Sequence, residues 1–99
     1  MKFLHYMVTA GPLELVDVRL SGPANVFLLD PLNYQNYRRR NKFIYHGGHY
    51  SGPDVKIKPP FRTTWHIVVD QGGAPGDVDA SVRVIPDPNT RGNYAYASQ

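Results

Sequence analysis

The strongest constraint on the fold is an alternation of apolar and polar residues that recurs along the chain. In residues 15–21 (LVDVRLS), Val16, Val18 and Leu20 fall on one side of an extended backbone, with polar residues between them. Residues 79–85 (DASVRVI) alternate in the same way. Because successive side chains of a strand point to opposite faces, this pattern predicts strands with one face in the core and the other in water.

Other stretches are apolar enough to form further short strands. They are residues 2–9, 25–30, 42–46, 55–58 and 65–70. Two of these runs, NVFLLD at 25–30 and WHIVVD at 65–70, are apolar on both sides, which favours strands covered on both faces. The chain is therefore expected to contain about seven short strands.

Groups of glycine and proline separate these stretches. They include AGP at 10–12, SGP at 21–23, HGGH at 46–49 and QGGAPGD at 71–77. Glycine tolerates positive φ and proline removes a backbone donor, so each group predicts a turn. Short strands at nearly regular spacing indicate one all-β domain over residues 1–86, an antiparallel β-sandwich of jelly-roll type.

The core of this sandwich is expected from the apolar sides of four strands, with Trp65 as its largest side chain. These strands are residues 13–20, 25–29, 65–69 and 78–85. A buried indole needs a partner for its N–H, unless Trp65 marks a binding surface instead.

One short helix is predicted near residues 30–37, with at most one or two turns. Asp30 can cap it, Pro31 suits its first turn, and Tyr34 and Tyr37 then share one face. After Pro86, residues 87–99 are polar and lack strand-length alternation. We expect them to form a tail that is mobile unless a partner holds it.

Composition limits the classes of function. The chain has no cysteine, which excludes a disulfide framework and a thiolate metal site. Its opening, MKFLHYMVTAG, is too short and too broken for a secretion signal, and no stretch reaches the ~18 apolar residues of a membrane span. We therefore expect a cytoplasmic protein that has no cofactor and no membrane partner.

The positive charge of the chain is concentrated in one stretch. Residues 37–50 (YRRRNKFIYHGGHY) hold four of the eleven Lys and Arg residues and none of the eight acids, in a chain of net charge +3. The guanidinium group of arginine can form two hydrogen bonds with a phosphate or carboxylate, and aromatic rings can stack on bases. The residues predicted to bind a ligand are Tyr37, Arg38, Arg39, Arg40, Lys42, Tyr45, Tyr50 and His66.

Several partners fit such a patch. A phosphate-bearing small molecule, an acidic protein surface and, less well, a nucleic acid all remain open. The alternative is a solvated loop whose arginines only keep a sheet edge soluble. Self-association through an open sheet edge or the Tyr94 and Tyr96 tail is also open.

The histidines and the acidic turn suggest weaker alternatives. His46 and His49, three residues apart, could join the other two histidines in a zinc site, but no carboxylate or cysteine lies near the pair and a Gly-Gly turn preorganises poorly. Asp70, Asp77 and Asp79 offer oxygen ligands for calcium, but the spacing of a known calcium loop is absent. His66 lies on the face opposite Trp65, where it either bonds a neighbouring strand or acts as a general base. No nucleophile or nucleotide-binding motif is present, so an enzyme is the less favoured class.

The order of blocks along the chain resembles a bacterial family, domain-of-unknown-function family eighteen-eighty-three. The blocks are MKFLHY, SGPANVFLLD, NYQNY, GG, WHIVVDQGG and GDVDASVRV, over about residues 1–86. The resemblance implies a compact all-β domain that is sometimes joined to TIR-class signalling domains, which make nucleotide messengers. It assigns no functional residues, and the triple arginine at 38–40 lies outside the family pattern.

These observations favour a non-catalytic binding or interaction module that uses the basic, aromatic stretch to hold an anionic partner. The leading alternative is capture or sensing of a nucleotide-derived signalling molecule, which the TIR association suggests. A small hydrolase or another enzyme comes third.

Overall fold

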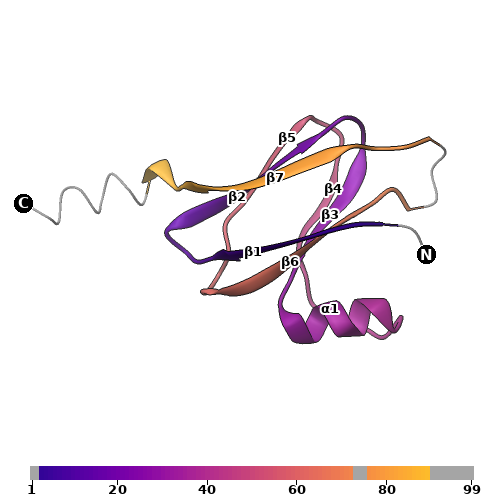
Figure 1. Cartoon of the computed structure of the whole chain (residues 1–99), viewed down its shortest axis with the longest axis horizontal. Helices are drawn as coiled ribbons and strands as arrows, with labels where there is room; N and C mark the ends of the chain where they lie inside the picture. Colours follow the sequence, from indigo (N-terminus) through magenta and orange to yellow (C-terminus); the bar gives the residue numbers. More distant parts are fainter. Residues whose placement is uncertain (1–2, 73–75, 90–99) are drawn as a thin grey trace, which may run out of the picture.

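The computed structural model, which describes residues 3–72 and 76–89, contains two antiparallel sheets packed face to face (Figure 1). The elements in chain order are β1 (Leu4–Ala10), β2 (Glu14–Leu20), β3 (Ala24–Leu29), α1 (Pro31–Arg38), β4 (His46–Tyr50), β5 (Asp54–Ile57), β6 (Thr63–Asp70) and β7 (Ala80–Pro86). The strand order is β1-β6-β3-β4 in one sheet and β5-β2-β7 in the other. The predicted all-β sandwich with one short helix is confirmed.

The alternation in β2 sets the main core between the sheets. Val16 and Val18 are fully buried, and β3, β6 and β7 contribute apolar side chains from their inner faces. Trp65 is 1% exposed, and its indole N–H donates to the carbonyl oxygens of Ala10 and Phe61, each at 3.2 Å. The prediction that Trp65 is the largest core side chain, with a partnered N–H, is confirmed.

A second, smaller core lies on the outer face of the four-stranded sheet, under α1. It contains Leu29 of β3, Val68 of β6, and Tyr34 and Tyr37 of the helix. This explains why β3 and β6 are apolar on both sides: one face packs on the other sheet and the opposite face packs on α1. Figure 1 shows the helix lying outside the sheets.

The ends of α1 are set by local hydrogen bonds. Asp30 caps the first turn, because its carboxylate accepts the N–H of Asn33 at 2.8 Å, and Pro31 follows it. At the other end Arg40 has a φ of 60°, and its N–H donates to the carbonyl oxygen of Tyr37 at 3.2 Å. Arg40 thus stands in the left-handed position that ends a helix and that glycine usually fills.

The sequence prediction is wrong between residues 42 and 50. The predicted strand at 42–46 is absent, and the predicted turn at 46–49 belongs to β4. Ile44 instead donates its N–H to the side-chain oxygen of Asn33 at 2.8 Å, which ties the loop to α1. Gly47 has a φ of 122°, and a Cβ there would overlap the carbonyl oxygen of Val26. The glycine therefore allows close pairing with β3 rather than a turn.

The end of the described chain is partly anchored. Asp87 is buried, and its N–H donates to the carbonyl oxygen of Leu13 at 3.1 Å. The rest of the predicted tail, residues 90–99, lies outside the described residues. Within residues 3–72 and 76–89, no helix is long and apolar enough to cross a membrane.

Candidate functional site

Four cations lie close together at residues 38–42, at the end of α1 and in the loop that follows. We call them the basic segment. Arg38, Arg39, Arg40 and Lys42 are all exposed. The carbonyl groups at a helix C-terminus carry partial negative charge, so arginines are well placed there. This attraction leaves the arginines charged, and their side chains remain exposed to solvent.

The basic segment differs from the other cations of the described residues in having no acidic partner among them. Five cations elsewhere in the described part of the chain form ion pairs with carboxylates: Arg19, Lys56, Lys58, Arg62 and Arg83. Within the same described ranges, none of the four cations of the basic segment does so. The segment therefore presents four exposed cations that have no carboxylate partner among the described residues.

Tyr45 lies at the far end of the same loop and is 45% exposed. Its ring contacts Phe27, with ring centroids 4.6 Å apart, and Phe43 at 5.6 Å. The ring is therefore supported from beneath while much of it stays open to solvent. Of the predicted aromatic ligands, Tyr45 is the one that the structure leaves exposed.

Tyr37 is placed differently, because it is a core residue only 5% exposed. Its hydroxyl donates to Oδ2 of Asp70 at 2.6 Å, and its ring meets Phe3 and Phe43 edge to face. Burial and the hydrogen bond to Asp70 raise the pKa of Tyr37 well above its ordinary value. Tyr37 thus fastens α1 to the sheet beneath the basic segment.

Tyr50 and His66 are also packed against neighbouring elements. Tyr50 is half-buried at the end of β4 and packs against the main core. His66 lies on β6, beneath the ring of Tyr34. The structure therefore leaves the four cations and Tyr45 exposed, and it places the other three predicted site residues in packing positions.

His66 forms a pair with His5 of the neighbouring strand β1. His5 Nε2 lies 2.8 Å from His66 Nδ1. The ring planes differ by 5° and the centroids are 5.0 Å apart, so the rings meet edge to edge through one N–H···N bond. The expectation that His66 bonds a neighbouring strand is confirmed, although its partner His5 was not foreseen.

Tyr34 lies flat over this histidine pair. Its ring centroid is 4.3 Å from that of His5 and 4.3 Å from that of His66, with nearly parallel planes. The Tyr34 hydroxyl is 3.3 Å from His5 Nδ1, and the Arg38 guanidinium lies 5.9 Å from the Tyr34 ring centroid. The three rings and the guanidinium thus join α1 to β1 and β6.

The two histidines share one hydrogen bond, and their arrangement does not suit the binding of a metal ion. One ring must donate and the other accept, and the two nitrogens point at each other instead of converging on a third atom. Burial lowers the pKa of His5, as does Arg38. Burial also lowers the pKa of His66, as does His5, while Asp30 opposes this shift. The pair is therefore largely uncharged at neutral pH.

The other two histidines do not meet. The His46 ring lies edge-on to Trp65, with centroids 5.7 Å apart. His49 Nδ1 is 3.2 Å from the side-chain oxygen of Asn25. Across the described ranges, no group of three or more His, Cys, Asp and Glu side chains is arranged to hold a metal ion.

A second charged cluster, which the sequence did not reveal, lies on the outer face of the three-stranded sheet. Asp17 of β2 has no solvent exposure. Its Oδ2 accepts from Arg83 Nε of β7 at 2.8 Å, and its Oδ1 lies 3.4 Å from Lys56 Nζ of β5. Arg19 lies 4.0 Å from the same carboxylate and 3.4 Å from Asp54.

The cations around Asp17 cover its carboxylate and also stabilise its charge. Burial alone would raise the pKa of Asp17. The hydrogen bond from Arg83 and the charge of Lys56 outweigh that effect, so its pKa lies below the ordinary value. The signal in the sequence is an acid between two buried valines, but finding its partners requires the strand register.

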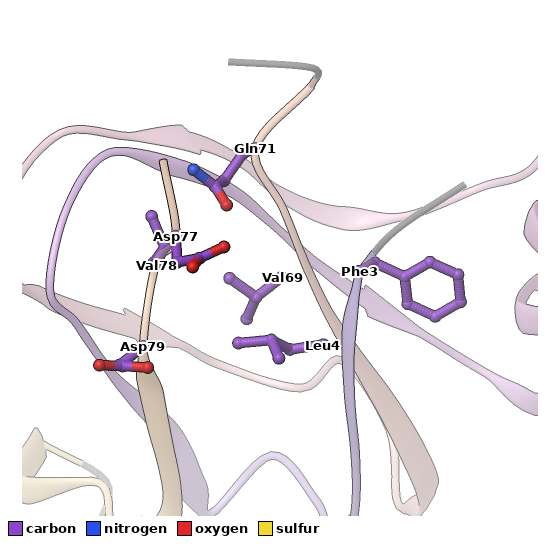
Figure 2. Close-up of a pocket in the computed structure, with 7 residues that line it drawn as sticks. All are labelled: Phe3, Leu4, Val69, Gln71, Asp77, Val78 and Asp79. Atoms are coloured by element: carbon purple, nitrogen blue, oxygen red, sulfur yellow. The ribbon is translucent and has the colours of Figure 1, made fainter. Parts of the chain in front are cut away.

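The described chain also contains a cavity of about 260 Å³ at one end of the sandwich (Figure 2). Leu4 and Val69 point into it, the Phe3 ring points away, and Asp77 and Asp79 lie at its border. Its described lining contains two carboxylates and no cation. None of the described residues that line the cavity belongs to the basic segment.

Comparison with known proteins places the chain in a family. No curated protein and no solved structure matches it. A family model described as a domain of unknown function, DUF1883, matches residues 1–88 of the 99. The match contains the helix, the basic segment and the seven strands of the described residues. The chain therefore belongs to the DUF1883 family.

Proposed function

We propose that this protein is a non-catalytic binding module that holds an anionic partner on its basic segment. The observation that carries the proposal is the contrast in pairing. Arg38, Arg39, Arg40 and Lys42 are exposed without acidic partners, whereas Arg19, Lys56, Lys58, Arg62 and Arg83 are ion-paired. Unpaired surface cations cost self-repulsion, and a bound anion relieves it.

The backbone around the segment supports the same proposal. Arg40 occupies a left-handed position, with φ 60°, where glycine is the relaxed choice. Arginine at this position places a cation on the surface, but its backbone conformation is less favourable than that of glycine. This is the pattern expected where a side chain is retained for binding rather than for stability.

A nucleotide is a second candidate ligand, favoured by one observation. Tyr45 is 45% exposed and stands three residues from Lys42, so a base could stack on its ring while a phosphate meets the cations. Such a ligand would lie on the open surface, because Tyr45 and the four cations are exposed. A rise in melting temperature with ADP-ribose, lost in Tyr45→Ala, would support it.

The main proposal is tested by neutralising the basic segment. A variant with Arg38, Arg39, Arg40 and Lys42 all changed to Gln should bind heparin at least about tenfold more weakly, because four charge-assisted contacts are lost. Isothermal titration measures the affinity, and an unchanged melting temperature shows that the fold is intact. Arg62→Gln, which removes an ion-paired cation, serves as a control. Equal heparin affinity in the wild type and the quadruple variant would refute the proposal.

A further inference from the structure

The basic segment is flanked by unusually exposed aliphatic side chains. Leu32, on α1, is 70% exposed, and Ile44, in the loop after α1, is 71% exposed. Among the large hydrophobic side chains exposed in the described residues, these two are the most exposed. Both stand in the acid-free stretch between Asp30 and Asp54 that contains the basic segment.

The path of the loop brings Ile44 close to α1. Asn41 donates its N–H to the carbonyl oxygen of Asn36 at 2.9 Å, and Ile44 donates to the side chain of Asn33 at 2.8 Å. The loop therefore runs back along α1 and brings Ile44 beside the residue that follows Leu32.

Helix geometry relates one of the cations, Arg39 at the C-cap of α1, to Leu32. Leu32 and Arg39 are seven residues apart, which puts them on the same side of the helix two turns from each other. Lys42 lies in the loop between Arg40 and Ile44. The combined surface, Leu32 and Ile44 together with the basic segment, carries four cations and two open aliphatic groups.

We propose that this combined surface docks on an anionic lipid bilayer. The inference rests on the proposed function and names the partner. A bilayer can interact with both parts of the surface. Its anionic headgroups bind the cations, and the boundary of its acyl chains accommodates the side chains of Leu32 and Ile44. A soluble polyanion would leave the two aliphatic side chains in water. No acidic residue between Asp30 and Asp54 opposes the headgroups.

Peripheral docking needs no membrane-spanning segment. The expectation of no membrane partner came from the lack of a long apolar stretch, which bears only on crossing the bilayer. A cluster of cations near an anionic leaflet gains roughly fivefold in partitioning per Lys or Arg. A few inserted aliphatic side chains then add the apolar contribution that distinguishes a lipid from a dissolved anion.

Vesicle flotation tests the inference. We expect the full chain to float with phosphatidylcholine vesicles containing phosphatidylglycerol and not with vesicles of phosphatidylcholine alone. Leu32→Ser/Ile44→Ser should weaken that binding by about tenfold, while heparin and polyglutamate binding stays unchanged. The matched control Met7→Ser/Leu13→Ser removes two other exposed apolar side chains and should bind vesicles as the wild type does.

A probe at residue 44 reports insertion directly. Because the chain has no cysteine, Ile44→Cys can be labelled selectively with a polarity-sensitive dye, with Leu13→Cys as the control position. A blue shift with anionic vesicles at residue 44, and none at residue 13, is expected. The melting temperature of each labelled variant checks its fold.

The outcomes separate the lipid inference from the proposed function. Charge-dependent binding to heparin or polyglutamate without vesicle binding, or vesicle binding that ignores Leu32 and Ile44, overturns the lipid inference and leaves the proposed function standing. If the quadruple Gln variant binds both vesicles and heparin as well as the wild type, both proposals fail.

Discussion

Two basic regions of this molecule contain the same residue types and use them in opposite ways. On the outer face of the three-stranded sheet, Arg19, Lys56 and Arg83 surround the buried carboxylate of Asp17. At the end of α1, the basic segment has no carboxylate partner among the described residues. Both sets of cations are exposed, so exposure alone does not distinguish them.

The difference indicates that structural cations are distinguished from functional ones by their ion pairs with carboxylates, and not by the number of charges in each region. The Asp17 cluster joins all three strands of its sheet, since its partners come from β5 and β7. Its charges are paired within the fold. The basic segment contributes no such link, so its charge remains available for a partner outside the chain.

The largest expected effect on stability comes from Asp17→Asn. This change leaves the Arg83 and Lys56 side chains facing each other without their shared anion, and we expect a loss of about 2 kcal/mol in the free energy of unfolding. That value is below the loss for a fully buried pair, because the cations are partly solvated. Urea denaturation measures it. If neutralising the basic segment costs as much stability as Asp17→Asn, the contrast between the two regions is wrong.

A smaller effect of opposite sign is expected from Arg40→Gly. Glycine relaxes the φ of 60° at the end of α1, so the free energy of unfolding should rise by about 0.5–1 kcal/mol. Heparin binding should weaken at the same time, because one unpaired cation is lost. Thermal unfolding and titration on the same protein measure both quantities. A loss of stability in Arg40→Gly would contradict the left-handed assignment.

The smallest expected effect is a pH dependence of stability from the His5–His66 pair. The pKa values of both histidines in the folded state lie below the ordinary 6.5. The unfolded chain therefore binds protons first as the pH falls. The stabilising contribution is complete above the ordinary pKa and is lost as the pH falls through 6.5 toward the folded pKa values.

Melting temperatures between about pH 7.5 and pH 5.5 measure this slope. His5→Gln/His66→Gln should flatten it. The Asp17 cluster should not contribute in this range, because the pKa of Asp17 lies below its ordinary 3.8 and the carboxylate stays ionised. The same slope in the double variant as in the wild type would show that other groups set the pH dependence.

Much of the fold was predictable because it depends on local pattern. Alternation located β2 and β7, and the double-sided apolar runs of β3 and β6 anticipated a layer on each face of the four-stranded sheet. The prediction failed at β4, where His46-Gly47-Gly48-His49 was interpreted as a turn. Glycine serves both turns and tight strand pairing, and only the contact of Gly47 with Val26 decides between them.

The candidate site was predictable only in part, because its main distinction is a long-range one. The cation cluster at 38–42 and its exposure follow from the sequence. That Arg19, Lys56 and Arg83 are paired does not, since Asp17 and Arg83 are 66 residues apart and their meeting depends on strand register. The His5–His66 pair, 61 residues apart, was hidden for the same reason.

The most direct test of the central claim compares two double variants that remove equal charge. Arg39→Gln/Lys42→Gln takes two unpaired cations, and Lys58→Gln/Arg62→Gln takes two paired ones. The affinity of each variant for heparin is measured by titration at one ionic strength. If pairing decides function, the first variant binds about tenfold more weakly than the second. Equal affinities would show that only net charge matters and would contradict the assignment of binding to the basic segment.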